Sequence, residues 1–128
     1  MQKLISSIDE LVNTQKIPIE FELNVYEINA SPSQAIALGM INSELISNAI
    51  KYAFVHEKKP KIKVELQRIK ENVFVYSVSD NGTGYDFSTA ENNKLGMRLI
   101  SIFSRQLKGK YEFKNENGLV YTLQFELL

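Results

Sequence analysis

The chain has 128 residues, of which 44% are hydrophobic and 23% are charged, and these values are typical of one soluble globular domain. Fifteen basic residues balance fifteen acidic ones, so no net field favours nucleic acid or an anionic membrane surface. The chain has no cysteine and one histidine, His56, which excludes disulfides, thiolate catalysis and metal clusters built from cysteine or histidine.

Hydropathy and the N-terminus bear on location. No apolar run approaches the ~20 residues that a membrane-spanning helix needs. The first residues lack the basic region and the apolar stretch of a signal peptide. We therefore expect a cytoplasmic segment that does not insert into a membrane and binds no nucleic acid, whether or not a parent protein is anchored in a membrane.

The first half of the chain predicts a helix, a strand and a second helix. Apolar residues in 1–13 fall on one helical stripe, whereas apolar and polar residues alternate in 17–24, as in a strand. Ser31 and Pro32 are typical of the N-cap and the first position of a helix. The helical pattern that begins there runs to about Phe54 and is the longest in the chain.

The second half predicts two pairs of strands separated by a loop and a helix. Apolar and polar residues alternate in the four strand segments, which are 61–69, 73–79, 110–115 and 119–128. Polar residues dominate 80–94, and 95–107 is an amphipathic helix that ends before Gly109. This order predicts an α+β fold, a two-layer sandwich with helices packed on one face of a mixed, mostly antiparallel sheet.

The segment SVSDNGTGYDF ends a predicted strand with Asp80 and continues with two glycines, Gly82 and Gly84. Asn81-Gly82 is a strong signal for a tight β-hairpin, but a hairpin requires a second strand directly afterwards. A polar loop and a helix that begins near Gly96 follow instead. Because glycines let backbone N–H groups approach a ligand and a helix N-terminus favours anions, we expect an anion or phosphate site here.

The long helix carries three polar residues at i, i+4 and i+7, namely Glu44, Asn48 and Lys51, which lie on one face of an α-helix. A carboxylate, an amide and a cation at the rim of an apolar pocket suit a polyphosphate bridged by Mg²⁺, which prefers oxygen ligands. The alternative interpretation is an ordinary solvated helix face, although asparagine is a poor residue for the middle of a helix. A neighbouring stripe of the same helix is apolar and contains Ile41, Leu45, Ala49 and Ala53.

Three segments together resemble the GHKL superfamily of ATP-binding domains, and the resemblance covers residues 18–127. INSELISNAIKYAF resembles its N box, DNGTG its G1 box and KLGMRLI its G2 box, in the family's order. The chain is similar to the catalytic domains of sensor histidine kinases, and within those to the HisKA_2 and HWE-like groups. This resemblance implies the Bergerat ATP-binding fold, ATP and Mg²⁺ as cofactors, and transfer of the γ-phosphoryl group to a histidine.

The resemblance also implies roles for residues of the G1 and G2 boxes. Asp80 matches the aspartate that accepts a hydrogen bond from the amino group of adenine, and an ionised carboxylate is a pure acceptor. Gly82 and Gly84 match the loop beside the base, and residues 85–94 match the ATP lid. The G2 box matches the start of a helix that meets the phosphates, and its expected nucleotide-binding residues are Leu95, Gly96, Met97 and Arg98.

In the N box, Asn48 matches the asparagine that binds Mg²⁺, and Glu44 matches a position that is acidic in several branches. In ATP-hydrolysing relatives that carboxylate activates water, so the resemblance implies that Glu44 is the catalytic residue and a second metal ligand. Lys51 and Tyr52 match positions near the phosphates and the ribose of the nucleotide.

Three positions depart from the family pattern. Lys94 occupies the place of the first G2 glycine, Phe87 is a weak candidate for an F box, and Leu119 replaces a common threonine after the last hairpin glycine. The lid is also short. The resemblance therefore implies nucleotide binding more directly than it implies any particular mode of lid closure.

A phosphoacceptor histidine is the missing part of such a kinase, since His56 lies in a polar break and lacks a helical setting. We therefore expect residues 17–128 to be the catalytic ATP-binding domain of a longer kinase. Residues 1–16 are then the tail of a preceding helical dimerisation region or a linker, and the alternative is a helix that packs on this domain's own core. The expected partners are the histidine-containing dimerisation domain of the parent chain and a downstream response regulator.

Three other functions fit the same boxes. One is a serine kinase of the anti-sigma-factor type, the second is a GHKL ATPase, and the third is a non-catalytic nucleotide-binding module. Retention of the polar and glycine residues argues against a decayed pocket, and these residues are Asn48, Asp80, Gly82, Gly84 and Gly96.

Overall fold

The computed structural model describes residues 18–54, 59–85 and 94–128. Its elements in chain order are β1 (Glu20–Val25), α2 (Pro32–Asn48), the π-helix η1 (Ala49–Ala53), β2 (Lys61–Lys70), β3 (Val73–Asp80), α3 (Lys94–Gln106), β4 (Lys110–Asn115) and β5 (Leu119–Glu126). The predicted helix 1–13, His56 and most of the predicted lid lie outside the described residues. No helix in the described ranges is long and apolar enough to cross a membrane.

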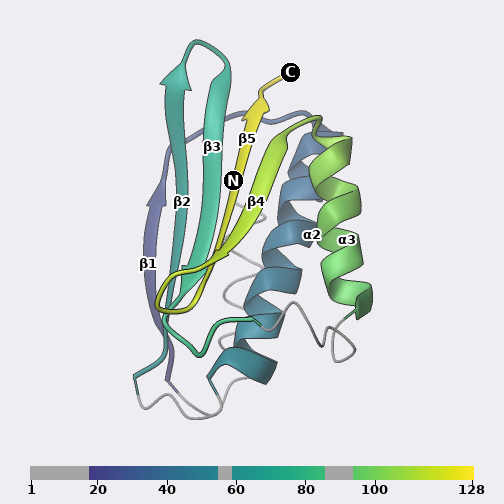
Figure 1. Ribbon diagram of the computed structural model, residues 1–128. Coiled ribbons are helices and arrows are strands. Elements are labelled where there is room, and N and C mark those ends of the chain that lie inside the picture. The colour runs from purple at the N-terminus through teal and green to yellow at the C-terminus, as the bar shows by residue number, and fades with distance from the viewer. Residues whose placement is uncertain (1–17, 55–58, 86–93) are drawn as a thin grey trace.

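The five strands form one sheet in the order β1-β2-β3-β5-β4. β1 pairs with β2 in parallel, and every other neighbouring pair is antiparallel. Both helices lie side by side on the same face of this sheet (Figure 1). The predicted α+β sandwich with a mixed, mostly antiparallel sheet is therefore confirmed.

The core lies between the helices and the inner face of the sheet. Alternate residues of β2, β3 and β5 are buried there, as the period-two patterns predicted. The apolar stripe of the long helix is buried as well, and its members are Ile41, Leu45, Ala49 and Ala53.

Two tyrosine hydroxyl groups of the core join the sheet to the helices. Tyr76 on β3 donates to Oδ1 of Asn42 on α2 at 2.6 Å, and the hydroxyl groups of Tyr121 and Ser104 lie 2.7 Å apart. Burial raises the pKa of both tyrosines above the ordinary value, so the hydroxyl groups stay neutral. These bonds fix which face of each helix meets the sheet.

The boundaries of the long helix follow its sequence signals, with one change in helix type. Ser31 caps α2 by accepting a hydrogen bond from the backbone N–H of Gln34, and Pro32 takes the first turn. The helical pattern does continue to Ala53, but the last five residues form a π-helix, in which Phe54 N donates to Ala49 O at 3.2 Å. π-helical turns inside α-helices are frequent at functional sites.

The first strand begins later than its alternation predicted. β1 starts at Glu20, and its register places Glu20 beside Lys61 on β2. The residue before Lys61 is Pro60, which has no backbone N–H to donate to a ladder. The ladder begins with Glu20, whose N–H donates to Pro60 O at 3.0 Å, whereas the predicted alternation began at residue 17.

Several segments that carry predicted site residues lie at one end of the molecule. The end of β3, the end of η1, the start of α3 and the turn between β4 and β5 all lie at the lower end in Figure 1. The C-terminus and the start of α2 lie at the opposite end. Segments that are far apart in the chain therefore lie at the same end of the molecule.

Candidate functional site

Asp80 ends β3 with its carboxylate held in one orientation. Its Oδ1 accepts hydrogen bonds from the backbone N–H groups of Gly82 at 2.9 Å and of Leu119 at 3.2 Å. Within the described ranges the structure records no donor for Oδ2. Burial raises the pKa of Asp80 above its ordinary value, against the smaller, lowering effect of the two backbone hydrogen bonds. The site therefore presents one oriented acceptor in partly desolvated surroundings.

The loop after Asp80 is fastened on two sides. Asn81 joins it to the start of β2, because its Oδ1 accepts from Lys61 N at 2.8 Å and its Nδ2 donates to Lys59 O at 2.9 Å. Thr83 N donates to Ala53 O at 3.1 Å, which joins the loop to the end of η1. Asn81 and Gly82 therefore belong to an anchored loop. The sequence predicted that they do not form a β-hairpin, and this prediction is confirmed.

Two glycines allow the close contacts around Asp80. A Cβ atom on Gly82 would overlap the backbone oxygen of Ala53, and one on Gly118 would overlap the backbone oxygen of Asp80. Gly118 also has a φ of +127°, a conformation that side chains with a Cβ rarely adopt. The sequence identified Gly82 as a site residue, whereas Gly118 was interpreted only as part of a hairpin turn.

We expect Gly118→Ala to lower the free energy of unfolding by about 2–3 kcal/mol, because the methyl group both overlaps the backbone of Asp80 and requires an unfavourable φ. Urea denaturation measures this change. Gly39→Ala is a matched control, since a Cβ on Gly39 meets nothing within 4 Å and alanine favours the interior of α2 by up to about 1 kcal/mol. Equal stability of the Gly118→Ala variant and the wild type would contradict the packing described for this turn.

Asn48 ends α2 and contacts the first turn of α3. Its side chain is 5% exposed, and its Nδ2 donates to Sδ of Met97 at 3.8 Å. This contact turns the amide oxygen away from the sulfur. Glu44, one turn earlier on the same face, is partly buried. Their side chains carry carboxylate and amide oxygens, which are ligands that Mg²⁺ prefers.

The π-helix changes the geometry of the predicted polar face. The spacing of Glu44, Asn48 and Lys51 assumed α-helical rotation throughout, but Lys51 and Tyr52 belong to η1, where hydrogen bonds join residues five apart. The rotation from Asn48 to Lys51 therefore differs from the α-helical value. Lys51 and Tyr52 are exposed at the end of the helix, whereas Asn48 is buried.

The predicted residues of the G2 box divide into two groups. Gly96 is buried and Met97 is partly buried against Asn48, so these two lie where α3 meets α2. Leu95 is 71% exposed and Arg98 is exposed, so they point away from the core. The start of α3 thus combines one side chain in contact with Asn48 and two outward side chains.

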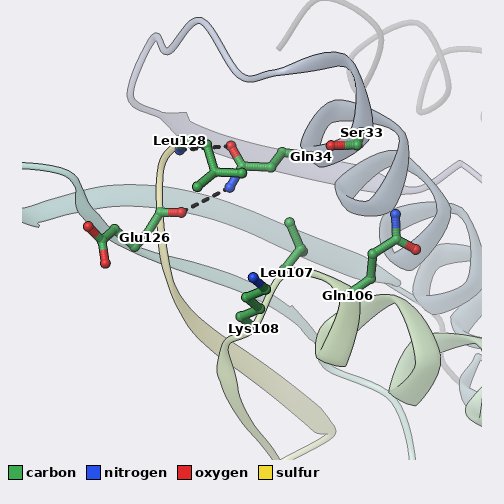
Figure 2. A pocket seen from close by; sticks show the side chains of 7 residues that line it. All are labelled: Ser33, Gln34, Gln106, Leu107, Lys108, Glu126 and Leu128. Carbon is green, nitrogen blue, oxygen red and sulfur yellow. Dashed lines mark hydrogen bonds between the residues drawn. The ribbon is translucent and has the colours of Figure 1, made fainter.

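A separate cavity of about 160 Å³ lies at the opposite end of the molecule, between the start of α2, the end of α3 and the end of β5 (Figure 2). Gln34 closes it on one side, because its Nε2 donates to Glu126 O at 2.9 Å and its Oε1 accepts from Leu128 N at 3.1 Å. None of the predicted site residues lines this cavity. The hydrogen bonds of the Gln34 amide hold Glu126 and Leu128 against α2.

A family model described as "Histidine kinase-, DNA gyrase B-, and HSP90-like ATPase" matches residues 33–128. No curated protein sequence matches the chain.

Solved structures with the same fold have low sequence identity to the chain. The histidine kinase domain from the Erythrobacter litoralis EL346 blue-light activated histidine kinase has a TM-score of 0.85 at 16% identity, over 97% of this chain and 59% of that one. The mycobacterial sensor histidine kinase MprB has a TM-score of 0.78 at 15% identity, over 98% and 93%. The Acinetobacter baumannii histidine kinase AdeS has a TM-score of 0.73 at 17% identity, over 98% and 62%.

Proposed function

Because the chain belongs to the family of histidine kinase-, DNA gyrase B- and HSP90-like ATPase domains, we propose that it is the ATP-binding catalytic domain of a sensor histidine kinase. The chain spans 59% of the length of the Erythrobacter litoralis domain. The observation that carries the proposal is the oriented carboxylate of Asp80 at the end of the molecule where Asn48 and the start of α3 also lie.

Asp80 is the residue that selects adenine in this proposal. Gly82 N and Leu119 N occupy Oδ1, so Oδ2 is the atom that faces a ligand. The 6-amino group of adenine donates a hydrogen bond, whereas the 6-oxo group of guanine or hypoxanthine accepts one. An ionised carboxylate therefore favours adenine over either of those bases.

The phosphates lie toward the end of α2 and the start of α3. Asn48 and Glu44 would hold Mg²⁺ through their side-chain oxygens, and the bound ion would neutralise part of the triphosphate charge. Lys51, exposed on η1, adds a cation, and the buried Gly96 lets the backbone of α3 come close to the phosphates. Tyr52 and the outward side chains Leu95 and Arg98 line the approach to the nucleotide.

The acceptor in this proposal is a neutral histidine on a separate helical dimerisation domain of the parent chain. One imidazole nitrogen attacks the γ-phosphorus, the bond from that phosphorus to the β–γ bridging oxygen breaks, and ADP leaves. Glu44 is positioned to take or hold the proton that the imidazole gives up. A response regulator then receives the phosphoryl group, which places this domain in two-component signalling in the cytoplasm.

The test uses the chain with Mg²⁺ and γ-³²P-labelled ATP, in the presence and absence of the helical acceptor domain of its parent. We expect label on the acceptor domain that is stable to alkali and lost in acid, as a phosphorus–nitrogen bond requires. Acid-stable label on a partner serine would replace the histidine kinase by a serine kinase. Steady release of phosphate by the chain alone would indicate an ATPase. Calorimetric binding of Mg²⁺-ADP without transfer or hydrolysis would indicate a non-catalytic nucleotide-binding module, and absence of heat would indicate a decayed pocket.

A further inference from the structure

We propose that Asn115, the last residue of β4, is a positioning residue. It fixes Tyr85, at the far end of the loop that follows Asp80, and this inference rests on the proposed function. Its side-chain amide binds the backbone of one residue twice. Tyr85 N donates to Oδ1 of Asn115 at 2.9 Å, and Nδ2 of Asn115 donates to Tyr85 O at 2.8 Å. The amide thus takes the place of a neighbouring strand for a single residue that lies 30 positions earlier in the chain.

Gly84 is shaped to admit this contact. A Cβ atom on Gly84 would lie 2.8 Å from Oδ1 of Asn115, closer than such atoms approach in proteins. Gly84 also has a φ of +83°, which turns the chain so that Tyr85 presents both its N–H and its C=O to Asn115. Position 84 therefore has to be glycine as long as the Asn115 side chain occupies this space.

The same hairpin also holds the start of the loop. Asn115 pairs with Leu119 in the β4–β5 register, and Leu119 N donates to the carboxylate of Asp80. One end of this hairpin therefore contacts the loop at Asp80 and again at Tyr85. Because these hydrogen bonds hold the loop at both ends, binding a nucleotide requires less ordering of the backbone.

The position of Asn115 at the surface makes this role separable from folding. Its side chain is exposed and contributes nothing to the apolar core. Removal of the amide frees Gly84 and Tyr85, whereas Asp80 keeps its bonds to Gly82 and Leu119. We therefore expect Asn115→Ala to change the affinity for nucleotide far more than it changes the midpoint of urea denaturation.

The experiment measures calorimetric affinity for Mg²⁺-ADP in the 128-residue chain. We expect Asn115→Ala to weaken binding roughly 5- to 10-fold, the loss that corresponds to about one net hydrogen bond. Asn115→Asp should not restore affinity, because it retains the acceptor for Tyr85 N but sets a carboxylate oxygen against Tyr85 O. Glu116→Ala, in the exposed turn beside Asn115, is the matched control and should bind like the wild type.

A double-mutant cycle separates positioning from a general effect on the surface. Gly84→Ala alone introduces the clash with Asn115 in addition to the strain of its φ. In the Asn115→Ala background the clash is gone, so the cost of Gly84→Ala for nucleotide affinity should fall. Hydrogen exchange provides a second readout, because the Tyr85 amide should lose protection in Asn115→Ala while the Leu119 amide keeps it.

Three outcomes would overturn the inference. Wild-type affinity and unchanged Tyr85 exchange in Asn115→Ala would overturn it and leave the proposed function standing, as would additive effects in the cycle. Absence of nucleotide binding by the wild type would overturn the proposed function together with this inference. The wild-type titration therefore distinguishes the two failures.

Discussion

Asp80→Asn is expected to weaken the binding of ATP and ADP by roughly 10- to 150-fold, the range for loss of a hydrogen bond to a charged group. The surrounding backbone decides the orientation of the new amide. Gly82 N and Leu119 N both donate to the Oδ1 position, so the asparagine oxygen must lie there and its NH₂ group must take the place of Oδ2. A donor then faces the donating amino group of adenine.

The same argument predicts a change of base preference, which calorimetry with ITP and ATP measures. The 6-oxo group of ITP accepts a hydrogen bond, so Asp80→Asn should bind ITP at least as well as ATP, whereas the wild type should prefer ATP. Unchanged ATP affinity in a folded variant would remove Asp80 from the binding site. If the variant binds more weakly but keeps the wild-type base preference, Asp80 maintains the shape of the loop and does not recognise the base.

Stability provides an independent control for this variant. Because burial raises the pKa of Asp80 in the folded protein, the folded state holds the proton more readily than the unfolded state, and ionisation of Asp80 opposes folding above the raised pKa. Asparagine removes that cost. The ligand-free variant should therefore be more stable than the wild type at neutral pH, and this advantage should disappear as the pH falls through the raised pKa toward the ordinary value of 3.8. Urea denaturation at several pH values measures the difference.

Asn48→Ala is expected to reduce phosphoryl transfer by roughly 10²–10³-fold, because it removes an oxygen ligand from the proposed Mg²⁺ site and with it electrostatic stabilisation of the transition state. Asn48 is buried against Met97, so the lost amide cannot be replaced by a neighbouring solvated side chain on the same turn. Transfer of label from γ-³²P-ATP to the acceptor domain measures the rate.

Nucleotide affinity with and without Mg²⁺ gives the control for Asn48→Ala. Binding of ADP in EDTA should match that of the wild type, whereas the gain in affinity on adding Mg²⁺ should be lost. Glu44→Gln is the companion variant, since it keeps an oxygen ligand but removes the carboxylate that would hold the imidazole proton. It should retain the Mg²⁺-dependent gain and lose transfer activity. A full Mg²⁺-dependent gain in Asn48→Ala would reject Asn48 as a metal ligand.

Local patterns along the chain were sufficient to predict the elements of this fold. Burial on one face of a helix or a strand repeats with a fixed period, so the alternation in 61–69 and 73–79 and the stripe in the long helix are visible without any neighbour. The order of these elements then predicted the two-layer sandwich. Asp80 and Asn48 were visible for a related reason: Asp80 ended a predicted strand, and Asn48 is a residue type that is unusual in the middle of a helical pattern.

Helix type and strand ends were predicted less well. The apolar stripe runs through Ala49 and Ala53 in either kind of helix, so nothing in the residue types marks the π-helical turn. The alternation at the start of β1 was predicted from residue 17, whereas pairing with β2 begins at Glu20, beside Lys61. Both differences concern the pairing of backbone hydrogen bonds, which the residue types do not show.

Residue types along the chain were enough to predict where most helices, strands and turns lie and which polar residues and glycines interrupt them. The surroundings of Asp80 are visible only in the folded chain: the N–H of Leu119 reaches it from 39 positions away, and Gly118 and Asn115 come from the same distant hairpin. The physical reason is that a backbone N–H is the same group in almost every residue, so Leu119 serves as well as threonine and leaves no mark in the sequence. Residue types show the chemistry of each side chain, whereas the partners of a backbone group depend on the fold of the whole chain.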